Sequence, residues 1–171
     1  LLKNGVIKDW GFEENSAAFT HTIAYTIRGF IESAIILDDW GNFGSPIEKS
    51  INKLYRQAEI NAGALPGMYD NNWKPDKSFV CLTGNAQVAI CLLRYEQIFP
   101  DLRLVNASIK LVDYVCNQQK KLKNYKLGSV AGSKPLWGKY MKFRYPNWAA
   151  KYHADSLILL MERLQIEEKN V

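Results

Sequence analysis

One pattern occurs three times along this chain: a short opening that contains glycine, a loop rich in aromatic residues, and a mostly apolar helix. The openings are KNGVI at 3–7, NAGAL at 61–65 and KLGSV at 126–130. Helices are predicted at 20–38, 84–99 and 147–164, so that their starts lie about 64 residues apart. A repeat of this length indicates a fold built from similar units that pack against their neighbours.

The three repeated helices have almost no polar face. The first contains TIAYTIRGFIESAIIL and the second NAQVAICLL. A helix of this kind is expected to be packed on most sides. We therefore predict that these three are inner helices of the fold.

Two amphipathic helices, predicted at 45–62 and 101–120, follow the first two inner helices. The first of them opens with Ser45, Pro46 and Glu48, which we predict to stand at the N-cap, N1 and N3 positions. The second has Leu104, Leu111 and other apolar residues on one face only. We predict that these two are solvated outer helices.

The predicted fold is all-α, with helical hairpins arranged as part of an α/α toroid. Strand signals are almost absent, and the best short candidate, 78–82, is weak. Loops of roughly 20 residues before each inner helix would gather on one face of such a toroid, where loops are usually functional. About two and a half hairpins make up about half of a six-hairpin ring, so the open flank should be apolar and is a possible homo-oligomer contact. We expect residues 1–171 to be one domain and a fragment of a longer chain.

Composition excludes several classes of function. The formal charge is +5, and the lysines are scattered except for Lys120, Lys121 and Lys123, so nucleic-acid binding is not expected. Three cysteines without metal-ligand spacing predict buried thiols in a reducing, cytoplasmic compartment. No apolar run is long enough for a membrane span, and we predict neither a metal nor a cofactor.

Several motifs resemble those of one group of proteins. They are THTIAYTIRG at 20–29, LPG at 65–67, WKP at 73–75, CLTGNAQ at 81–87 and YPNWAAK at 145–151. In these motifs the chain resembles the C-terminal part of bacterial α/α-toroid proteins associated with polysaccharide and capsule biosynthesis. That group is similar in architecture to six-hairpin glycosidases and to terpenoid-cyclase and prenyltransferase toroids. The resemblance implies that the motif residues line a shared cavity, and it implies no catalytic residue.

Candidate functional residues fall near the starts of the inner helices, where free amide groups and the helix dipole favour anionic or hydroxyl-rich ligands. In the first helix, His21, Tyr25, Arg28 and Glu32 form a single stripe. His21 is a candidate for proton transfer, Tyr25 for a hydroxyl acid or a hydrogen-bond donor, and Arg28 for binding a carboxylate. Alternatively, Arg28 pairs with Glu32 and His21 caps the helix.

The second and third helix starts offer groups that could hold a sugar. Amide side chains and tryptophan rings bind sugar hydroxyls and stack on sugar rings, although Asn85 could equally serve as a helix cap. Lys151 and Asp155 are spaced as an ion pair, and Asp155 is also a candidate catalytic acid. The predicted substrate-binding residues are Trp10, Asp70, Trp73, Asn85, Gln87, Trp137, Tyr140, Tyr145, Asn147, Trp148 and Lys151.

The predicted function is therefore binding or processing of an acidic or amino-sugar oligosaccharide or polysaccharide, as a hydrolase, lyase or epimerase if the chain is an enzyme. A non-catalytic interaction domain, for a protein or a glycan, is the first alternative. The second is a cyclase with an isoprenoid substrate, although Asp38 and Asp39, which come closest to the acidic cluster of such enzymes, lie at the far end of their helix.

Overall fold

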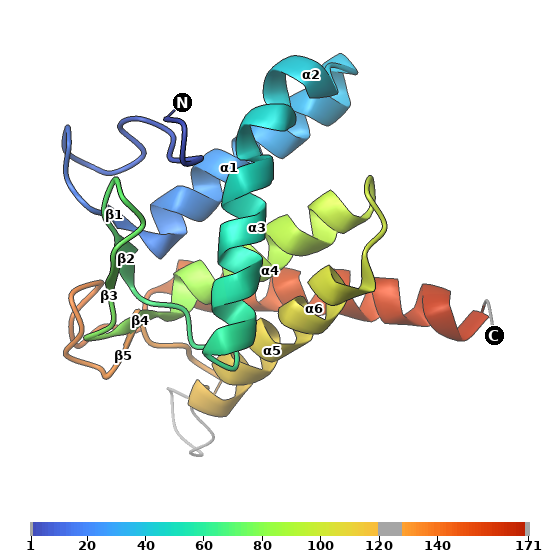
Figure 1. Cartoon of the computed structure of the whole chain (residues 1–171). Coiled ribbons are helices and arrows are strands. Elements are labelled where there is room, and N and C mark those ends of the chain that lie inside the picture. Colours follow the sequence, from blue (N-terminus) through green and yellow to red (C-terminus); the bar gives the residue numbers. More distant parts are fainter. Residues whose placement is uncertain (1, 120–127, 170–171) are drawn as a thin grey trace.

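A computed structural model describes residues 2–119 and 128–169 of the chain. The described part is helix-rich. Its helices are α1 (Thr20–Leu37), α2 (Trp40–Phe43), α3 (Ser45–Ile60), α4 (Leu82–Glu96), α5 (Leu102–Gln118) and α6 (Asn147–Lys169) (Figure 1). All five predicted helices are present, and each begins within two residues of its predicted start. The lysine cluster at 120–123 and the first two residues of the third opening, 126–127, lie outside the described residues.

The expectation of an all-α chain is wrong in one respect, because two small antiparallel sheets are present. Their strands are β1 (Ala18–Phe19), β2 (Met68–Tyr69), β3 (Pro75–Asp76), β4 (Val80–Cys81) and β5 (Ser133–Lys134). One sheet has the order β1-β2-β3 and the other pairs β4 with β5. β4 lies within 78–82, the weak strand candidate of the sequence. The other four strands, of two residues each, leave no alternating pattern by which local signals could reveal them.

The sheets hold together the three loops that precede the inner helices. In register, Ala18 faces Tyr69, which joins the first loop to the second, and Cys81 faces Ser133, which joins the second to the third. Figure 1 shows these strands together at the end of the molecule where α1, α4 and α6 begin. The loops thus fix the relative positions of the three helix starts.

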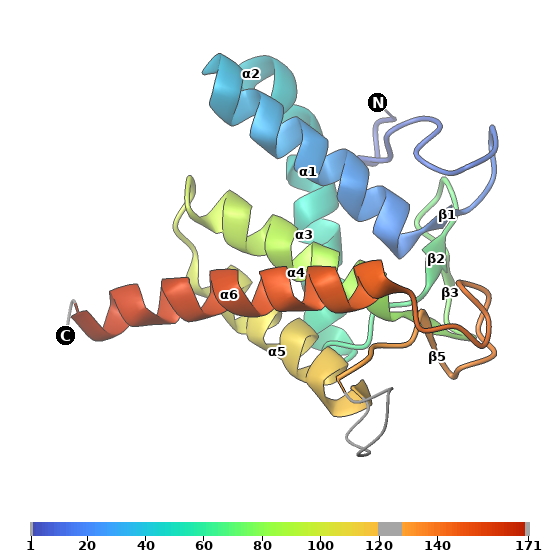
Figure 2. The same ribbon diagram turned by 180° about the vertical axis from the view of Figure 1, so that it is seen from behind.

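Helix α4 is the central helix of the described fold, with α1, α5 and α6 all packed against it (Figure 2). Most of its residues are buried on every side. The expectation that all three inner helices are enclosed is wrong for α1 and α6. Apolar side chains at the end of α1, such as Ile36, and on α6, such as Ile158 and Met161, are exposed.

The start of α3 also differs from its predicted cap. Pro46 lies in the first turn as predicted, but Ser45 makes no capping hydrogen bond and Gly44 is the N-cap. The physical reason is that α2 leads directly into α3, so that Gly44 has helical backbone angles rather than the extended ones of a side-chain cap. Asp38 and Asp39 form the turn before α2, where the Asp39 side chain accepts a hydrogen bond from the Asn42 amide.

Candidate functional site

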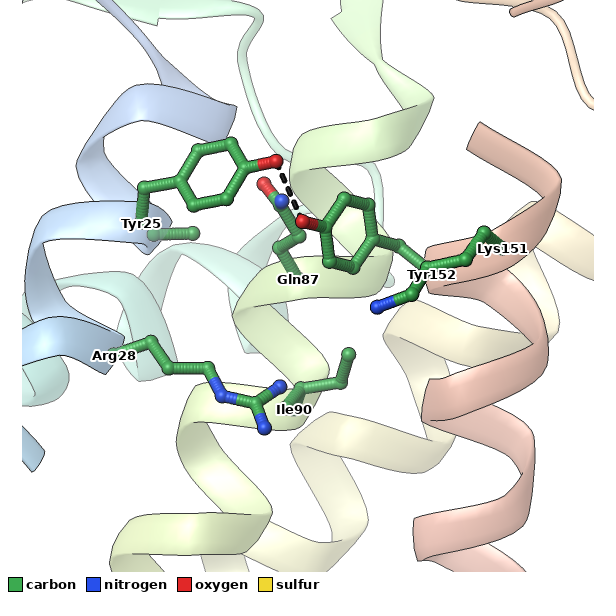
Figure 3. A pocket seen from close by; sticks show the side chains of 7 residues that line it. Tyr25, Arg28, Gln87, Ile90, Lys151 and Tyr152 are labelled. Carbon is green, nitrogen blue, oxygen red and sulfur yellow. Dashed lines mark hydrogen bonds between the residues drawn. The ribbon is translucent and has the colours of Figure 1, made fainter. Parts of the chain in front are cut away.

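A pocket of about 200 Å³ lies between the first halves of α1, α4 and α6 (Figure 3). Its lining residues are Ala24, Tyr25, Arg28, Gln87, Ile90, Lys151 and Tyr152. We call it the three-helix pocket. It brings together Tyr25, Arg28, Gln87 and Lys151, which are predicted site residues from three different helices.

The repeat explains why these side chains meet. Tyr25, Gln87 and Tyr152 are each five residues after the first residue of their helix, at equivalent positions of α1, α4 and α6. Because the paired loops align the three helix starts, equivalent positions face one another. Tyr152 was absent from the predicted site residues. Its equivalence to Tyr25 is the sequence signal that could have found it.

Two phenols join α1 to α6 across the mouth of the pocket. The Tyr25 and Tyr152 hydroxyl oxygens are 2.5 Å apart, and their rings meet edge to face with centroids 5.7 Å apart. Burial and the hydrogen bond with Tyr152 raise the pKa of Tyr25, an effect that Gln87 and Lys151 partly oppose. The phenol is therefore protonated at neutral pH and suited to hydrogen bonding rather than to accepting a proton.

Two cations line the pocket beside the phenols. The Arg28 Nε is 3.3 Å from Glu32 Oε1, but Glu32 accepts two shorter hydrogen bonds, of 3.0 and 2.9 Å, from Arg94. The Lys151 Nζ is 2.6 Å from Asp155 Oδ2 and 4.2 Å from the centre of the Tyr152 ring. The sequence predicted these two ion pairs as alternatives to a functional role of Arg28 and Lys151, and both pairs are present.

The charge balance of the pocket is nevertheless positive. No carboxylate is among its lining residues, as far as the structure describes the chain. The Arg94 guanidinium is the largest cause of the lowered pKa of Glu32, ahead of Arg28, so Glu32 is engaged mainly by Arg94. Arg28 keeps much of its capacity to attract an anion.

Gln87 lies at the base of the pocket and is only 4% exposed. Its carbonyl oxygen, Oε1, is buried and has no hydrogen-bond partner in the described structure. Asn85, two residues earlier, does not line the pocket. Its side-chain amide donates a hydrogen bond to the Gly63 carbonyl of the loop after α3. This amide therefore binds the protein backbone and not a ligand.

A second hollow of about 340 Å³ adjoins the three-helix pocket and shares Arg28 and Ile90 with it. Asp155, the candidate acid, lines this hollow together with Glu32, Arg94 and residues of the next turns of α6. The candidate acid therefore lies beside the three-helix pocket rather than in it.

His21 is buried among aromatic rings and does not line the three-helix pocket. Its ring centroid is 4.3 Å from that of Tyr140, and Nδ1 is 4.0 Å from the Cys81 sulfur. Burial lowers the pKa of His21 to about 4, so the imidazole is neutral at pH 7. Nor does it cap α1, whose N-cap is Phe19.

The remaining predicted residues lie in the loops or, for Asn147 and Trp148, in the first turn of α6, and they do not line the three-helix pocket. Trp10 and Trp73 pack edge to face, with centroids 5.2 Å apart, in the core beneath the first two loops. Asp70 accepts two backbone hydrogen bonds in its own turn, from Asn72 and Lys74, each 2.8 Å long.

The third loop and the first turn of α6 hold the other predicted aromatic residues. The Trp148 indole donates a 2.9 Å hydrogen bond to the Tyr140 hydroxyl, and Asn147 Oδ1 accepts from the Trp148 amide. Trp137 is exposed, and Tyr145 packs against the cluster around Val130.

The described residues contain neither a cluster of metal ligands nor a helix that could cross a membrane. No three His, Cys, Asp or Glu side chains come together there as a metal site requires. In the same residues, every helix is too short or too polar to cross a membrane. Comparison with models of protein families, with curated proteins and with solved structures finds no match to this chain.

Proposed function

We propose that this chain binds an acidic sugar, as a unit of an oligosaccharide or polysaccharide, in the three-helix pocket. The observation that carries the proposal is the pairing of two cations, Arg28 and Lys151, with hydroxyl and amide groups around one hollow that no carboxylate lines. A uronic acid offers both the carboxylate and the ring hydroxyls that such groups bind. Ala24 and Ile90 add an apolar surface for the C–H face of a sugar ring.

Binding is better supported than a reaction. Glycoside hydrolysis needs two carboxyl groups on either side of the bond, and no lining residue of the pocket carries one. A lyase or an epimerase needs a base, and the raised pKa of Tyr25 makes its phenol a weak one at neutral pH. A pocket with two cations is also a poor site for an isoprenoid. A glycan-binding domain is thus the leading form of the proposal.

The proposed architecture is an arc of an α/α toroid. In its support, three helices begin at one end of the molecule, where short strands join the loops that precede them. Ile158 and Met161 are exposed on α6, as expected of an open flank that further helices or a second copy would cover.

The first test removes one cation. Lys151→Gln should weaken binding of a glucuronic or galacturonic acid oligosaccharide by about 5- to 20-fold, because a charge-assisted hydrogen bond contributes about 1–2 kcal/mol. Isothermal titration calorimetry measures the change. Lys110→Gln is the matched control, because Lys110 also pairs with a carboxylate, Glu59, at 2.7 Å and does not line the pocket.

Three results would decide against the proposal. Equal weakening by both substitutions would show a general effect of charge. Equally tight binding of a neutral glucose oligosaccharide would show that the two cations do not contribute to affinity. Release of unsaturated or hydrolysed product, detected by ultraviolet absorbance and mass spectrometry, or of epimerised product, detected by NMR, would show that the chain is an enzyme.

A further inference from the structure

We infer that Gln87 makes the three-helix pocket specific for a sugar acid with two adjacent free hydroxyl groups, as opposed to anions in general. The inference rests on the proposed function and names the hydroxyl groups that the pocket recognises in addition to the carboxylate. Gln87, on α4, would distinguish a hexuronate from other carboxylates.

The observation is an unpaired buried acceptor. Gln87 is 96% buried, since its exposed fraction is 4%, and its Oε1 atom has no hydrogen-bond partner. Figure 3 shows its carboxamide beside the hydroxyl groups of Tyr25 and Tyr152, at the pocket that Arg28 and Lys151 also line. A buried carbonyl oxygen without a partner is unfavourable, so a ligand that supplies a donor to it gains affinity.

None of the neighbouring groups donates to Oε1 in the described structure. The Tyr25 and Tyr152 hydroxyls lie 2.5 Å apart, and one of them donates to the other. Arg28 and Lys151 are paired with Glu32 and Asp155. A ligand hydroxyl can therefore supply the donor that Oε1 lacks.

The geometry of a carboxamide specifies what kind of ligand this is. Its carbonyl and NH₂ group lie side by side, so one ring hydroxyl can donate to Oε1 while the adjacent hydroxyl accepts from Nε2. An ionised carboxylate or sulfate has acceptors only and would leave Oε1 unpaired. A hexuronate satisfies both requirements, because its carboxylate can face Arg28 and Lys151 while its ring hydroxyls face Gln87.

The test compares ligands that share a ring and a carboxylate. The probes are glucuronate, galacturonate and mannuronate, with tetrahydropyran-2-carboxylate, which has no hydroxyl groups, as the matched control. We expect the tightest of the three hexuronates to bind the full chain at least about tenfold more tightly than the control, as sites built to bind a hydroxyl reject analogues that lack it. Ligand-observed NMR titration measures these affinities.

Substitution then assigns the preference to Gln87. Gln87→Met keeps the length of the side chain and removes both hydrogen bonds, so it should weaken hexuronate binding about tenfold and change binding of the control ligand less than about twofold. Lys151→Gln should weaken both ligands alike, because both carry the carboxylate. Circular dichroism and thermal unfolding check that each variant is folded.

The outcomes separate the two proposals. If Lys151→Gln weakens both ligands but Gln87→Met weakens both equally, the acidic-sugar site stands and the role of Gln87 is overturned. If Lys151→Gln affects neither ligand, the proposed function fails and the inference fails with it. If Gln87→Met does not fold, the comparison of ligands on the unaltered chain decides, and equal binding of hexuronate and control overturns the inference.

Discussion

At the scale of single residues, burial decides what His21 can do. Phe12, Phe19 and Tyr140 surround its ring, and burial alone lowers its pKa to about 4. A stripe of polar residues on α1 indicated that His21 and Tyr25 would share a site. They share a face of the helix, with ring centroids 6.1 Å apart, but only Tyr25 lines the pocket. Proton transfer by His21 stays a prediction.

The lowered pKa of His21 predicts how stability depends on pH. In the unfolded chain a histidine titrates near 6.5, whereas His21 in the fold takes a proton only below about 4. Between these values the unfolded chain binds more protons, so the free energy of unfolding should fall as the pH falls, by up to about 3 kcal/mol from His21. Urea unfolding at a series of pH values measures this slope.

His21→Phe isolates that contribution. The variant keeps an aromatic ring and has no proton to take up, so its free energy of unfolding should change less between pH 6.5 and 4. His153, whose pKa burial also lowers, remains in both proteins and cancels in the comparison. Identical slopes in the two proteins would show that His21 does not titrate as burial predicts.

At the scale of secondary-structure elements, α1 and α4 are in close contact at Gly84. A Cβ atom on Gly84 would lie 2.8 Å from the His21 backbone nitrogen and 2.9 Å from the Thr20 Cβ. Such distances are too short for atoms that are not bonded, and the backbone of α1 cannot move away cheaply. Gly84 therefore sets the spacing of two helices that line the pocket.

Two glycine substitutions should have effects of opposite sign. Gly84→Ala should lower the free energy of unfolding by about 1–3 kcal/mol, through overpacking between α1 and α4. Gly29→Ala, on α1 where no atom lies within 4 Å of the added Cβ, should raise it by about 0.5–1 kcal/mol, because alanine favours the helix. Chemical denaturation measures both. Stabilisation by Gly84→Ala would contradict the close contact.

At the scale of the whole molecule, an ion pair holds the second half of α6 against α4. Arg163 donates two hydrogen bonds of 2.9 Å to Glu96, whose side chain is 3% exposed. The two helices thus remain packed beyond the pocket that lies between their first halves. The position of α6 determines the shape of the three-helix pocket, because α6 contributes Lys151 and Tyr152 to its lining.

Arg163→Met should cost about 3–5 kcal/mol of stability, because it leaves the buried Glu96 carboxylate without its partner. Arg103→Met is the matched control. Its pair with Asp101 is short too, at 2.7 Å, but the Arg103 side chain is 72% exposed, so the loss of stability should be much smaller than that of Arg163→Met. Thermal unfolding of the two variants provides the comparison. Equal losses would mean that the pair of Arg163 and Glu96 does not hold α6 in place.

Local signals in the sequence were sufficient for the helices. The apolar runs and the Pro46 start predicted all five long helices, because these signals lie within the residues that form each helix. The repeated helix starts predicted a shared site, and Tyr25, Gln87 and Lys151 line one pocket. They did not separate the pocket from the aromatic clusters around it, since Trp10 and Trp73 have the composition of ligand-binding residues and pack in the core.

What the sequence determined by itself was therefore the set of helices and their repeated order, because backbone periodicity and helix-start chemistry act between neighbouring residues. Only the tertiary structure decided the rest. The pairing of two-residue strands brings residues tens of positions apart into register, and packing on α4 determines which polar side chains are buried, paired or left facing a hollow. Those are contacts between distant segments, and no pattern within a single helix or loop encodes them.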